Sequence, residues 1–346
     1  MDYHHNGFVY KQTDALKNSI GHDKKLPDNL FKYYSLSKKS VDAIINGELY
    51  ASHPFDLNDV FDCSHNLWYA NKPIKFENYE WFYDKVLDKE EVIKVFEQDS
   101  RQGHRKFIVE FWTLLSDKFG IISMSGQESD LLMWPHYSGE YGFQVKFSAR
   151  KLEKDITEGR NAVLTPVNYV DKLEMIDVSE RDSFIVPFIY STNIKYKNWS
   201  YENEWRFLVE GKGMGIPYSK VGFETILEDH KGNDGARLIK YEVDLQEEIT
   251  LGKHFFNPRR FVYNKMEDEN GVKTIQVKVR ECDESANLIG LLDHISFHEK
   301  LRGNVFLTGH YLVFEDVITP YIERGKEKVS LTKIGEGEYS LIYGLR

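Results

Sequence analysis

Two glutamates lie two positions apart in the segment YENEWR at residues 201–206. On a strand, Glu202 and Glu204 would project from the same face and act on one site. A carboxylate so placed can hold a sugar hydroxyl and stabilise the positive charge that develops when a glycosidic bond breaks. The alternative is one face of an exposed strand, with Arg206 completing a row of weak surface ion pairs.

Three other segments gather polar and aromatic side chains beside predicted strands. Sites in mixed sheets are often assembled from the loops that follow strands. The segments are FKYYS at 31–35, FDLNDVFD at 55–62 and SMSGQESDLLMWPHYSGEYGF at 123–143, and the glutamate pair belongs to a fourth, KYKNWSYENEWR at 195–206. We expect these four segments to form one site.

The elements that position these segments follow from hydrophobic patterning. Apolar runs predict buried strands at 119–125 and 204–210, and two helical patterns cover about residues 88–117. Ser37 or Ser40 caps a predicted helix that follows the first segment. SDLLMWPHYS predicts a short helix that is stopped by Pro135.

The pattern as a whole predicts an α+β fold, a mixed or split sheet with flanking helices. We expect an N-terminal extension at residues 1–29, a core domain at 30–281, and a C-terminal α/β addition at 282–346.

Charge and composition narrow the classes of function. The chain has 45 basic and 55 acidic side chains and a formal net charge of −10, which weighs against a broad nucleic-acid footprint. No segment has the uncharged length that a membrane span needs, and the N-terminus lacks the apolar run of a signal peptide. We therefore expect a cytoplasmic protein without membrane partners. Cys63 and Cys282 lack metal-site spacing and are expected to be reduced, buried thiols, and no metal is predicted.

The four segments, in this order, resemble the domain-of-unknown-function family 2971. Its pattern is a K-Y start, an F-N-D-P-F-D loop, an S-x-S strand end, an M-W-x-H-Y helix and a W-x-Y-E-x-E-W-R close. The resemblance extends over roughly residues 30 to 280. The loop departs from the pattern, because one residue is inserted before Asn58 and Val60 stands where proline is usual.

The order of motifs also resembles ADP-ribosyltransferase folds, in which a polar first strand, a Ser-x-Ser strand end and an E-x-E strand surround NAD. This resemblance implies that Glu204 holds the ribose of NAD and that Glu202 orients the acceptor. His136 is added to these two as a catalytic hydrogen-bond donor. The resemblance to ADP-ribosyltransferase folds also implies that Lys32 neutralises the pyrophosphate and that Ser123 fixes a ribose or the carboxylate. It further implies that Trp134 or Tyr137 stacks on nicotinamide. The remaining predicted binding residues are Tyr33, Ser125, Asn58 and Asp59.

Each of these assignments has a structural alternative. Trp134 is of a type that usually belongs to a core, and the serines at 123 and 125 can form a turn. A single His136 without a second ligand at the right spacing does not predict zinc. Asn58 and Asp59 can tie the loop through side-chain to backbone bonds.

Three functions follow as hypotheses. The first is an NAD-consuming enzyme, an ADP-ribosyltransferase or NAD glycohydrolase acting as a toxin or phage-defence effector, with NAD as substrate and an unidentified protein or nucleic-acid acceptor. The second is a metal-dependent nuclease that uses Asp59, Asp62, Glu204 and Lys197. The third is a non-enzymatic module that binds a nucleotide or a protein. No Gly-rich phosphate loop is present, which excludes a Rossmann or P-loop route to the nucleotide.

Overall fold

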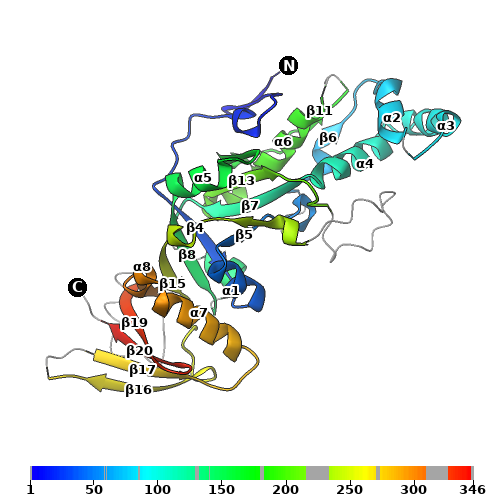
Figure 1. Cartoon of the computed structure of the whole chain (residues 1–346). Coiled ribbons are helices and arrows are strands. Elements are labelled where there is room, and N and C mark those ends of the chain that lie inside the picture. Colours follow the sequence, from blue (N-terminus) through cyan, green and yellow to red (C-terminus); the bar gives the residue numbers. More distant parts are fainter. Residues whose placement is uncertain are drawn as a thin grey trace. The chain divides into compact units, whose positions relative to one another are not determined.

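The computed structural model describes residues 2–57, 59, 61–84, 86–128, 132–139, 141–179, 183–215, 234–269, 273–308 and 326–343. The fold is α+β, as predicted, and the chain forms two compact units, each made from three separate stretches (Figure 1). Unit 1 comprises Met1–Lys25, Tyr50–Ser123 and Thr157–Ile239, and unit 2 comprises Leu26–Leu49, Met124–Ile156 and Lys240–Arg346. Among the described residues, no helix combines the length and the apolar character needed to cross a membrane.

Unit 1 contains most of the α-helical residues that precede the glutamate pair at 202 and 204. Its helices are α2 (Phe76–Tyr83), α3 (Lys89–Ser100), α4 (Arg105–Ser116) and α6 (Ile185–Asn193). Its strands are β1 (Tyr3–His5), β2 (Phe8–Tyr10), β3 (Ile20–Gly21), β6 (Trp68–Tyr69), β7 (Phe119–Ser125, whose last two residues belong to unit 2), β9 (Ala162–Pro166), β10 (Asn168–Val170), β11 (Ile176–Asp177), β12 (Ile194–Tyr196) and β13 (Glu204–Glu210).

Unit 2 is dominated by strands. Its helices are α1 (Lys38–Ile45), α5 (Ala149–Thr157), α7 (Ser285–Phe297), α8 (Glu299–Arg302) and the π-helical turn η4 (Trp134–Ser138). Its strands are β4 (Asn29–Tyr34), β8 (Phe143–Ser148), β15 (Gln246–Leu251), β16 (Phe261–Glu267), β17 (Lys273–Val279), β18 (Val305–Leu307), β19 (Glu327–Gly335) and β20 (Glu338–Tyr343). The short strands β5 (Glu48–Tyr50) and β14 (Leu238–Lys240) pair with each other in a separate two-stranded sheet.

The two strands predicted most directly from apolar runs occur with the expected bounds. They are β7 and β13, which lie next to each other in the order β7-β13-β9. β13 pairs antiparallel with β9, with Trp205 opposite Pro166 and Val209 opposite Ala162. Six of the seven β13 residues are buried, so both of its faces are covered.

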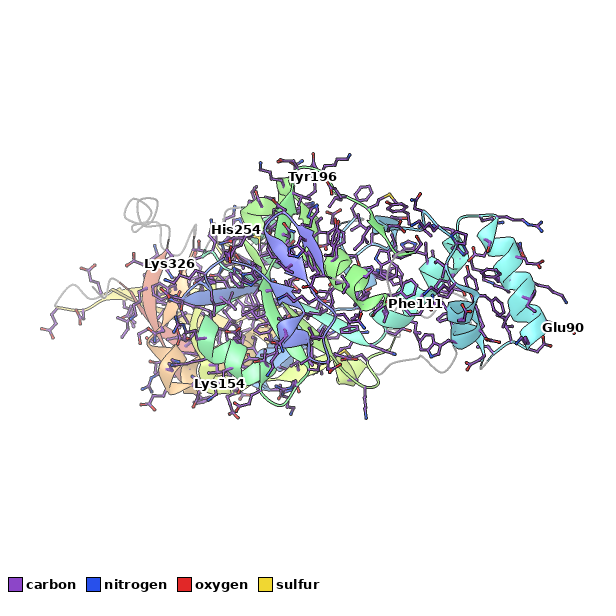
Figure 2. All side chains as sticks on the ribbon, turned by 90° about the horizontal axis from the view of Figure 1, so that it is seen from above. Glu90, Phe111, Lys154, Tyr196, His254 and Lys326 are labelled. Atoms are coloured by element: carbon purple, nitrogen blue, oxygen red, sulfur yellow. The ribbon has the colours of Figure 1, made fainter. Side chains whose placement is uncertain are left out.

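Aromatic side chains fill the core of unit 1. The Phe111 and Phe184 rings lie 4.5 Å apart, and those of Phe119 and Phe188 lie 5.0 Å apart, so α4, α6 and β7 are packed through their rings. Figure 2 labels Phe111 among these side chains, and Glu90 on the helix α3. A helix with apolar residues along one stripe, as in α4, buries that stripe and leaves its other face polar.

Residues 1–29 were expected to be an extension, but the part up to Lys25 belongs to unit 1 and contains the three-stranded sheet β1-β2-β3. Phe8 and Tyr10 are buried in its hydrophobic core. The Asn168 amide donates hydrogen bonds to the His5 carbonyl and to the Tyr10 hydroxyl, at 3.2 and 3.1 Å, which ties this sheet to the start of β10. These strands are too short to show an alternating apolar pattern in the sequence. They form because burial against distant segments stabilises them.

In unit 2 the strand order is β16-β17-β20-β19-β18-β15-β8-β4. The sheet is mixed, because β15 and β18 run parallel while the other pairs are antiparallel. The segment 282–346, expected to be a C-terminal addition, contributes β18, β19 and β20 between β15 and β17. The last strands of the chain are therefore interior strands of this sheet.

The local features expected at Ser37, Pro135 and the two cysteines are only partly present in the structure. Ser37 is the N-cap of α1, and its side chain accepts a hydrogen bond from the Ser40 backbone N–H at 3.2 Å. Pro135, in contrast, lies in the first turn of η4 and does not stop a helix. A proline is tolerated there because the N–H it lacks has no partner in a first turn. Cys63 is buried as expected, whereas Cys282 is only half-buried.

A buried polar network joins α2, α3 and α4. The Asp99 carboxylate accepts hydrogen bonds from the Tyr79 hydroxyl at 2.6 Å and from the backbone N–H groups of Lys106 and Phe107, both at 2.9 Å. The Ile74 N–H donates to His104 Nε2, so the proton of this imidazole is on Nδ1, which faces the Tyr79 hydroxyl at 2.9 Å. Asp99 therefore caps the first turn of α4.

Replacing Asp99 with alanine leaves three donors without their acceptor, and two of them, the Tyr79 hydroxyl and the Phe107 N–H, are buried. We expect the Asp99→Ala variant to lose about 3 kcal/mol in the free energy of unfolding, measured by urea denaturation. Glu97→Ala is the matched control, because Glu97 is exposed on the same helix, and it is expected to change stability by less than about 0.5 kcal/mol. Equal stabilities of the two variants would contradict the capping role.

Candidate functional site

Arg206 on β13 is buried in unit 1 with only 2% of its surface exposed. Its Nε donates to Glu204 Oε1 at 2.7 Å and its Nη2 to Glu204 Oε2 at 2.9 Å. The other edge of the guanidinium binds both carboxylate oxygens of Asp62, with Nη1 to Oδ1 at 2.7 Å. Nη1 also donates to the Thr192 carbonyl at the end of α6, at 2.8 Å. One planar cation thus bridges two carboxylates, an arrangement that the forked donors of arginine favour.

Lys195 on β12 is a second buried cation beside the same carboxylates. Its Nζ lies 2.6 Å from Glu202 Oε2, 3.3 Å from Glu204 Oε2 and 3.5 Å from Asp62 Oδ2. The ammonium also lies 4.9 Å from the centre of the half-buried Trp199 ring. We call Asp62, Lys195, Glu202, Glu204 and Arg206 the buried charge cluster, and each of them is at most 5% exposed.

The charges of this cluster do not balance. Three carboxylates and two cations give a formal sum of −1 in a region shielded from water. Burial of ionised groups is unfavourable unless each is paired and hydrogen-bonded, and an excess charge remains strongly felt where the dielectric is low. The site is therefore suited to a group that carries or develops positive charge.

The pKa values of Glu204 and Lys195 are shifted by the opposite charges that surround each of them. Burial alone raises the pKa of Glu204, but the charges of Arg206 and Lys195 and hydrogen bonds from Arg206 and Ser123 outweigh it and hold the pKa far below its usual value. Burial lowers the pKa of Lys195, and the neighbouring carboxylates, Glu204 first, reverse this and raise it. Glu204 and Lys195 are accordingly ionised at neutral pH.

Two left-handed backbone positions shape the cluster. Cys63, with φ of 51°, follows Asp62 in a turn where the Phe61 N–H donates to Asp59 Oδ1 at 3.0 Å. Asn203, with φ of 42°, ends the 3₁₀ turn η5 (Lys197–Glu202) directly before β13. Asparagine tolerates this region better than most residues, and here it lets Glu202 and Glu204 converge on Lys195.

The backbone of Glu204 is fixed by the neighbouring strand segment. Its N–H donates to the Tyr169 hydroxyl at 3.0 Å, and its carbonyl accepts from the Val167 N–H at 2.9 Å. Burial, followed by the charge of Glu204, raises the pKa of Tyr169 well above its usual value, so the phenol stays neutral. Position 204 is thus held by its main chain and by its side chain.

The structure brings only some of the predicted residues together. Glu204 accepts a hydrogen bond from Ser123, and Glu202 shares Lys195 with Glu204. The expectation that both glutamates project from one strand was wrong, because Glu202 ends η5 and only Glu204 lies on β13. Asp59 organises the turn before Asp62 through its side chain, as in the structural alternative. Asn58 lies outside the described residues.

The other predicted residues belong to unit 2. Lys32 and Tyr33 lie on β4, and Trp134, His136 and Tyr137 lie on η4. The Tyr33 and Trp134 rings meet edge to face at 5.3 Å and both are buried, so Trp134 is a core residue. His136 is exposed. Ser125 forms a local turn, since its hydroxyl accepts from the Gln127 N–H at 3.1 Å and donates to the Gln127 carbonyl at 3.0 Å.

Sequence reasoning did not assign a role at this site to Lys195, Arg206 or Tyr169. The spacing contained a usable signal for Arg206, because residues 204 and 206 share a face of one strand that is otherwise apolar. A cation in such a strand needs a buried carboxylate as partner. Which carboxylate supplies the second partner, Asp62, depends on tertiary contacts that no local pattern encodes.

The nuclease arrangement does not form as expected. Lys197 is exposed and pairs with Asp171 at 3.1 Å, outside the buried charge cluster. Within the described part of the chain, no group of three or more His, Cys, Asp or Glu side chains is arranged to hold a metal ion.

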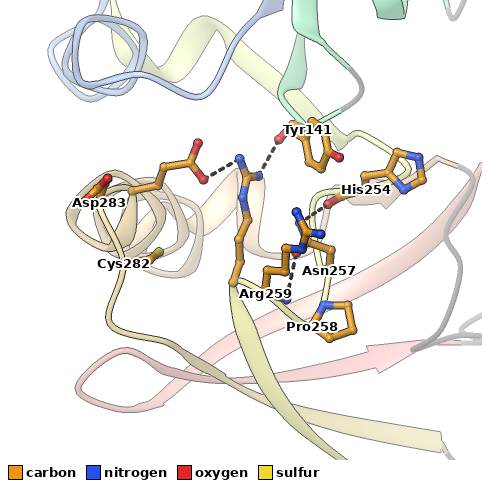
Figure 3. Close-up of a pocket in the computed structure, with 9 residues that line it drawn as sticks. Tyr141, His254, Asn257, Pro258, Arg259, Cys282 and Asp283 are labelled. Atoms are coloured by element: carbon orange, nitrogen blue, oxygen red, sulfur yellow. Dashed lines mark hydrogen bonds and ion pairs between the residues drawn. The ribbon is translucent and has the colours of Figure 1, made fainter.

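A separate pocket of about 680 Å³ lies within unit 2 (Figure 3). Arg260 forms one wall, pairing with Glu284 at 2.6 Å and donating to the Tyr141 carbonyl at 3.2 Å. Two arginines and two carboxylates line the pocket, so their charges balance, and Tyr141 is its one contribution from the four predicted segments. We therefore base the proposed chemistry on the buried charge cluster.

Fold and site together define an α+β protein with a buried, net acidic cluster drawn from β12, η5, β13 and the loop that contains Asp62. Residues 133–207 match the family model described as Protein of unknown function (DUF2971), which confirms the predicted family over a region that ends just after Arg206. No curated protein and no solved structure matches the chain.

Arg206 is the cation that bridges Asp62 and Glu204, so replacing it leaves both carboxylates buried without their guanidinium partner. We expect Arg206→Met to lower the free energy of unfolding by about 3–5 kcal/mol, measured by urea denaturation. Lys197→Met is the control, since it removes an exposed pair and is expected to change stability by less than about 1 kcal/mol. A small loss for Arg206→Met would indicate that this cluster is not a cohesive unit.

The lowered pKa of Glu204 predicts how stability depends on pH. Its unfolded value is near 4.5, so the stability contributed by the ionised form is present above that pH and is lost as the pH falls below it. Between about pH 5 and about pH 3 the free energy of unfolding should fall more steeply for the parent than for Glu204→Gln. Parallel curves for the two proteins would refute the assignment.

Proposed function

We propose that this protein consumes NAD, as an ADP-ribosyltransferase or NAD glycohydrolase, with the buried charge cluster as the centre that stabilises charge on the ribose. The observation that carries the proposal is the formal sum of −1 in a cluster of acidic and basic side chains that are at most 5% exposed. An oxocarbenium-like ribose is the kind of cation that such a preorganised site favours.

In the proposed reaction the bond between nicotinamide and ribose breaks heterolytically. Nicotinamide leaves with the electron pair as a neutral molecule, and the ribose carbon becomes positive. A water molecule or an acceptor hydroxyl then attacks this carbon and releases one proton to solvent, giving ADP-ribose or an ADP-ribosylated product. Glu204 supplies negative charge to the ribose, and Glu202 lies beside it to orient the attacking group.

The contacts of Glu204 restrict how it would engage the sugar. A carboxylate offers about four acceptor positions, and Arg206, Lys195 and Ser123 together supply four contacts to it. Arg206 and Lys195 are buried and fixed, whereas Ser123 is half-buried. In the proposal, a ribose hydroxyl therefore takes the place of the Ser123 hydroxyl on Glu204.

Because the acceptor positions of Glu204 are already occupied, the structure also favours a second candidate function. This candidate is a non-enzymatic nucleotide-binding module in which the buried charge cluster is structural. Under this candidate NAD raises the melting temperature of the protein, yet no nicotinamide is released. The enzymatic proposal requires release, so one set of assays separates the two candidates.

The test is to incubate the protein with NAD and measure free nicotinamide by chromatography, together with transfer of labelled ADP-ribose to lysate proteins. We expect Glu204→Gln to reduce the rate at least about 100-fold and Ser123→Ala to change KM with a smaller effect on kcat. Glu210→Gln is the control, because it lies on the same strand but is exposed, and it should retain the parental rate.

Circular dichroism of each variant accompanies the assay, so that a loss of folding is not taken for a loss of chemistry. Absence of both nicotinamide and labelled product with the folded parent protein would reject the proposal. So would equal rates for the parent and a folded Glu204→Gln variant.

A further inference from the structure

Strand β16 is the end strand of the sheet in unit 2 (Figure 1). All seven of its residues pair with β17 in an unbroken antiparallel register from Phe261 to Glu267. Within the described part of the chain it has no second neighbouring strand. It carries neither a proline nor a bulge, which are two of the features by which edge strands commonly avoid pairing with other chains.

The side chains of β16 form an exposed stripe. Val262 is 44% exposed and Met266 is 46% exposed. Both lie on the same face of the strand as Asn264, because they are separated from it by two residues in either direction. A single exposed apolar residue is ordinary, but two on one face of an unpaired edge form a surface that can take another strand.

The sequence of this strand is complementary to itself. If β16 pairs antiparallel with β16 of a second copy about Asn264, Val262 faces Met266 of that copy, and Met266 faces its Val262. Cross-strand apolar pairs of this kind stabilise a sheet. A shift of the register by one residue would instead place Val262 opposite Lys265 or Glu267, so the apolar stripe selects this centre.

The charged residues that flank β16 favour the same antiparallel pairing about Asn264. Arg259 precedes Asn264 by five residues and Glu269 follows it by five, so the register that joins Val262 to Met266 also brings Arg259 near Glu269 of the second copy. Both side chains are exposed, and neither has an ion-pair partner among the described residues. The Arg259 backbone N–H donates to Asn257 Oδ1 at 2.9 Å, so the turn is held independently of the guanidinium.

We propose that two copies of this chain associate through antiparallel β16–β16 pairing centred on Asn264, with Val262–Met266 and Arg259–Glu269 contacts repeated by the two-fold axis. An isologous contact of this kind closes on itself and forms a dimer. Seven residues on each side bury less area than a standard stable interface, so the dimer is weak, with a dissociation constant of roughly 1–100 μM.

The test is sedimentation velocity of the full chain over about 1–300 μM, with the charge pair reversed in steps. Arg259→Glu places like charges opposite each other, and so does Glu269→Arg, so each single variant should weaken the dimer about tenfold. The double variant R259E/E269R restores opposite charges and should return the dissociation constant to within about threefold of the parent.

Arg302→Glu is the matched control, because it makes the same charge change at an exposed arginine elsewhere in unit 2, and it should leave the dimer unchanged. A parent that is monomeric throughout the concentration range would overturn the proposal. A dimer that is indifferent to both single variants, or that the double variant does not restore, would also overturn it. The assay contains no NAD, so its outcome is independent of the enzymatic proposal.

Discussion

A guanidinium buried between two carboxylates is the interaction on which the architecture of unit 1 depends. Arg206 is 2% exposed, and its donors bind Asp62, Glu204 and the end of α6. An unpaired charge in such a place is unfavourable by several kcal/mol, so the loop around Asp62, the end of α6 and β13 are stable only together. This explains why a polar loop in the first half of the chain is ordered against a strand some 140 residues later.

The cluster also sets the limits of the proposed chemistry. A site that must stabilise a transient cation benefits from charges that are fixed in advance, because they need no reorganisation during the reaction. The contacts that fix Glu204 also occupy its oxygens, so only the Ser123 side of the carboxylate is open to exchange with a ligand. The contacts that fix Glu204 therefore also limit how far its carboxylate can bind a ligand. Under the enzymatic proposal a ribose hydroxyl displaces Ser123, whereas in a binding module the carboxylate keeps a structural role.

Much of the secondary structure was predictable because it depends on local patterns. Strands β7 and β13 follow from unbroken apolar runs, and α1 follows from a serine cap and an apolar stripe. The first 25 residues were not recognised as strands, because β1, β2 and β3 have two or three residues each and depend on burial against distant segments. Pro135 was misjudged because a proline is compatible with the first turn of a helix as well as with its end.

The candidate site was predictable in part. Glu202 and Glu204 both contact Lys195, but through a turn at Asn203 instead of the predicted shared strand face, and Ser123 hydrogen-bonds Glu204. The identity of the counter-ions was not recognised, because Lys195 and Arg206 resemble surface residues until the tertiary fold encloses them. Trp134 illustrates the opposite case, since an aromatic residue in a family motif serves the core of unit 2. The family match at 133–207 spans both kinds of residue.

The order of strands in unit 2 has a consequence for protein synthesis. β16 and β17 leave the ribosome before β18, β19 and β20, yet they join the rest of their sheet only through β20. Until β20 is available, the β16–β17 hairpin has no neighbouring strand on its β17 side, and until β18 is available β15 pairs only with β8. During synthesis these strands therefore expose unpaired edges, which are the parts of a sheet most prone to pairing with other chains.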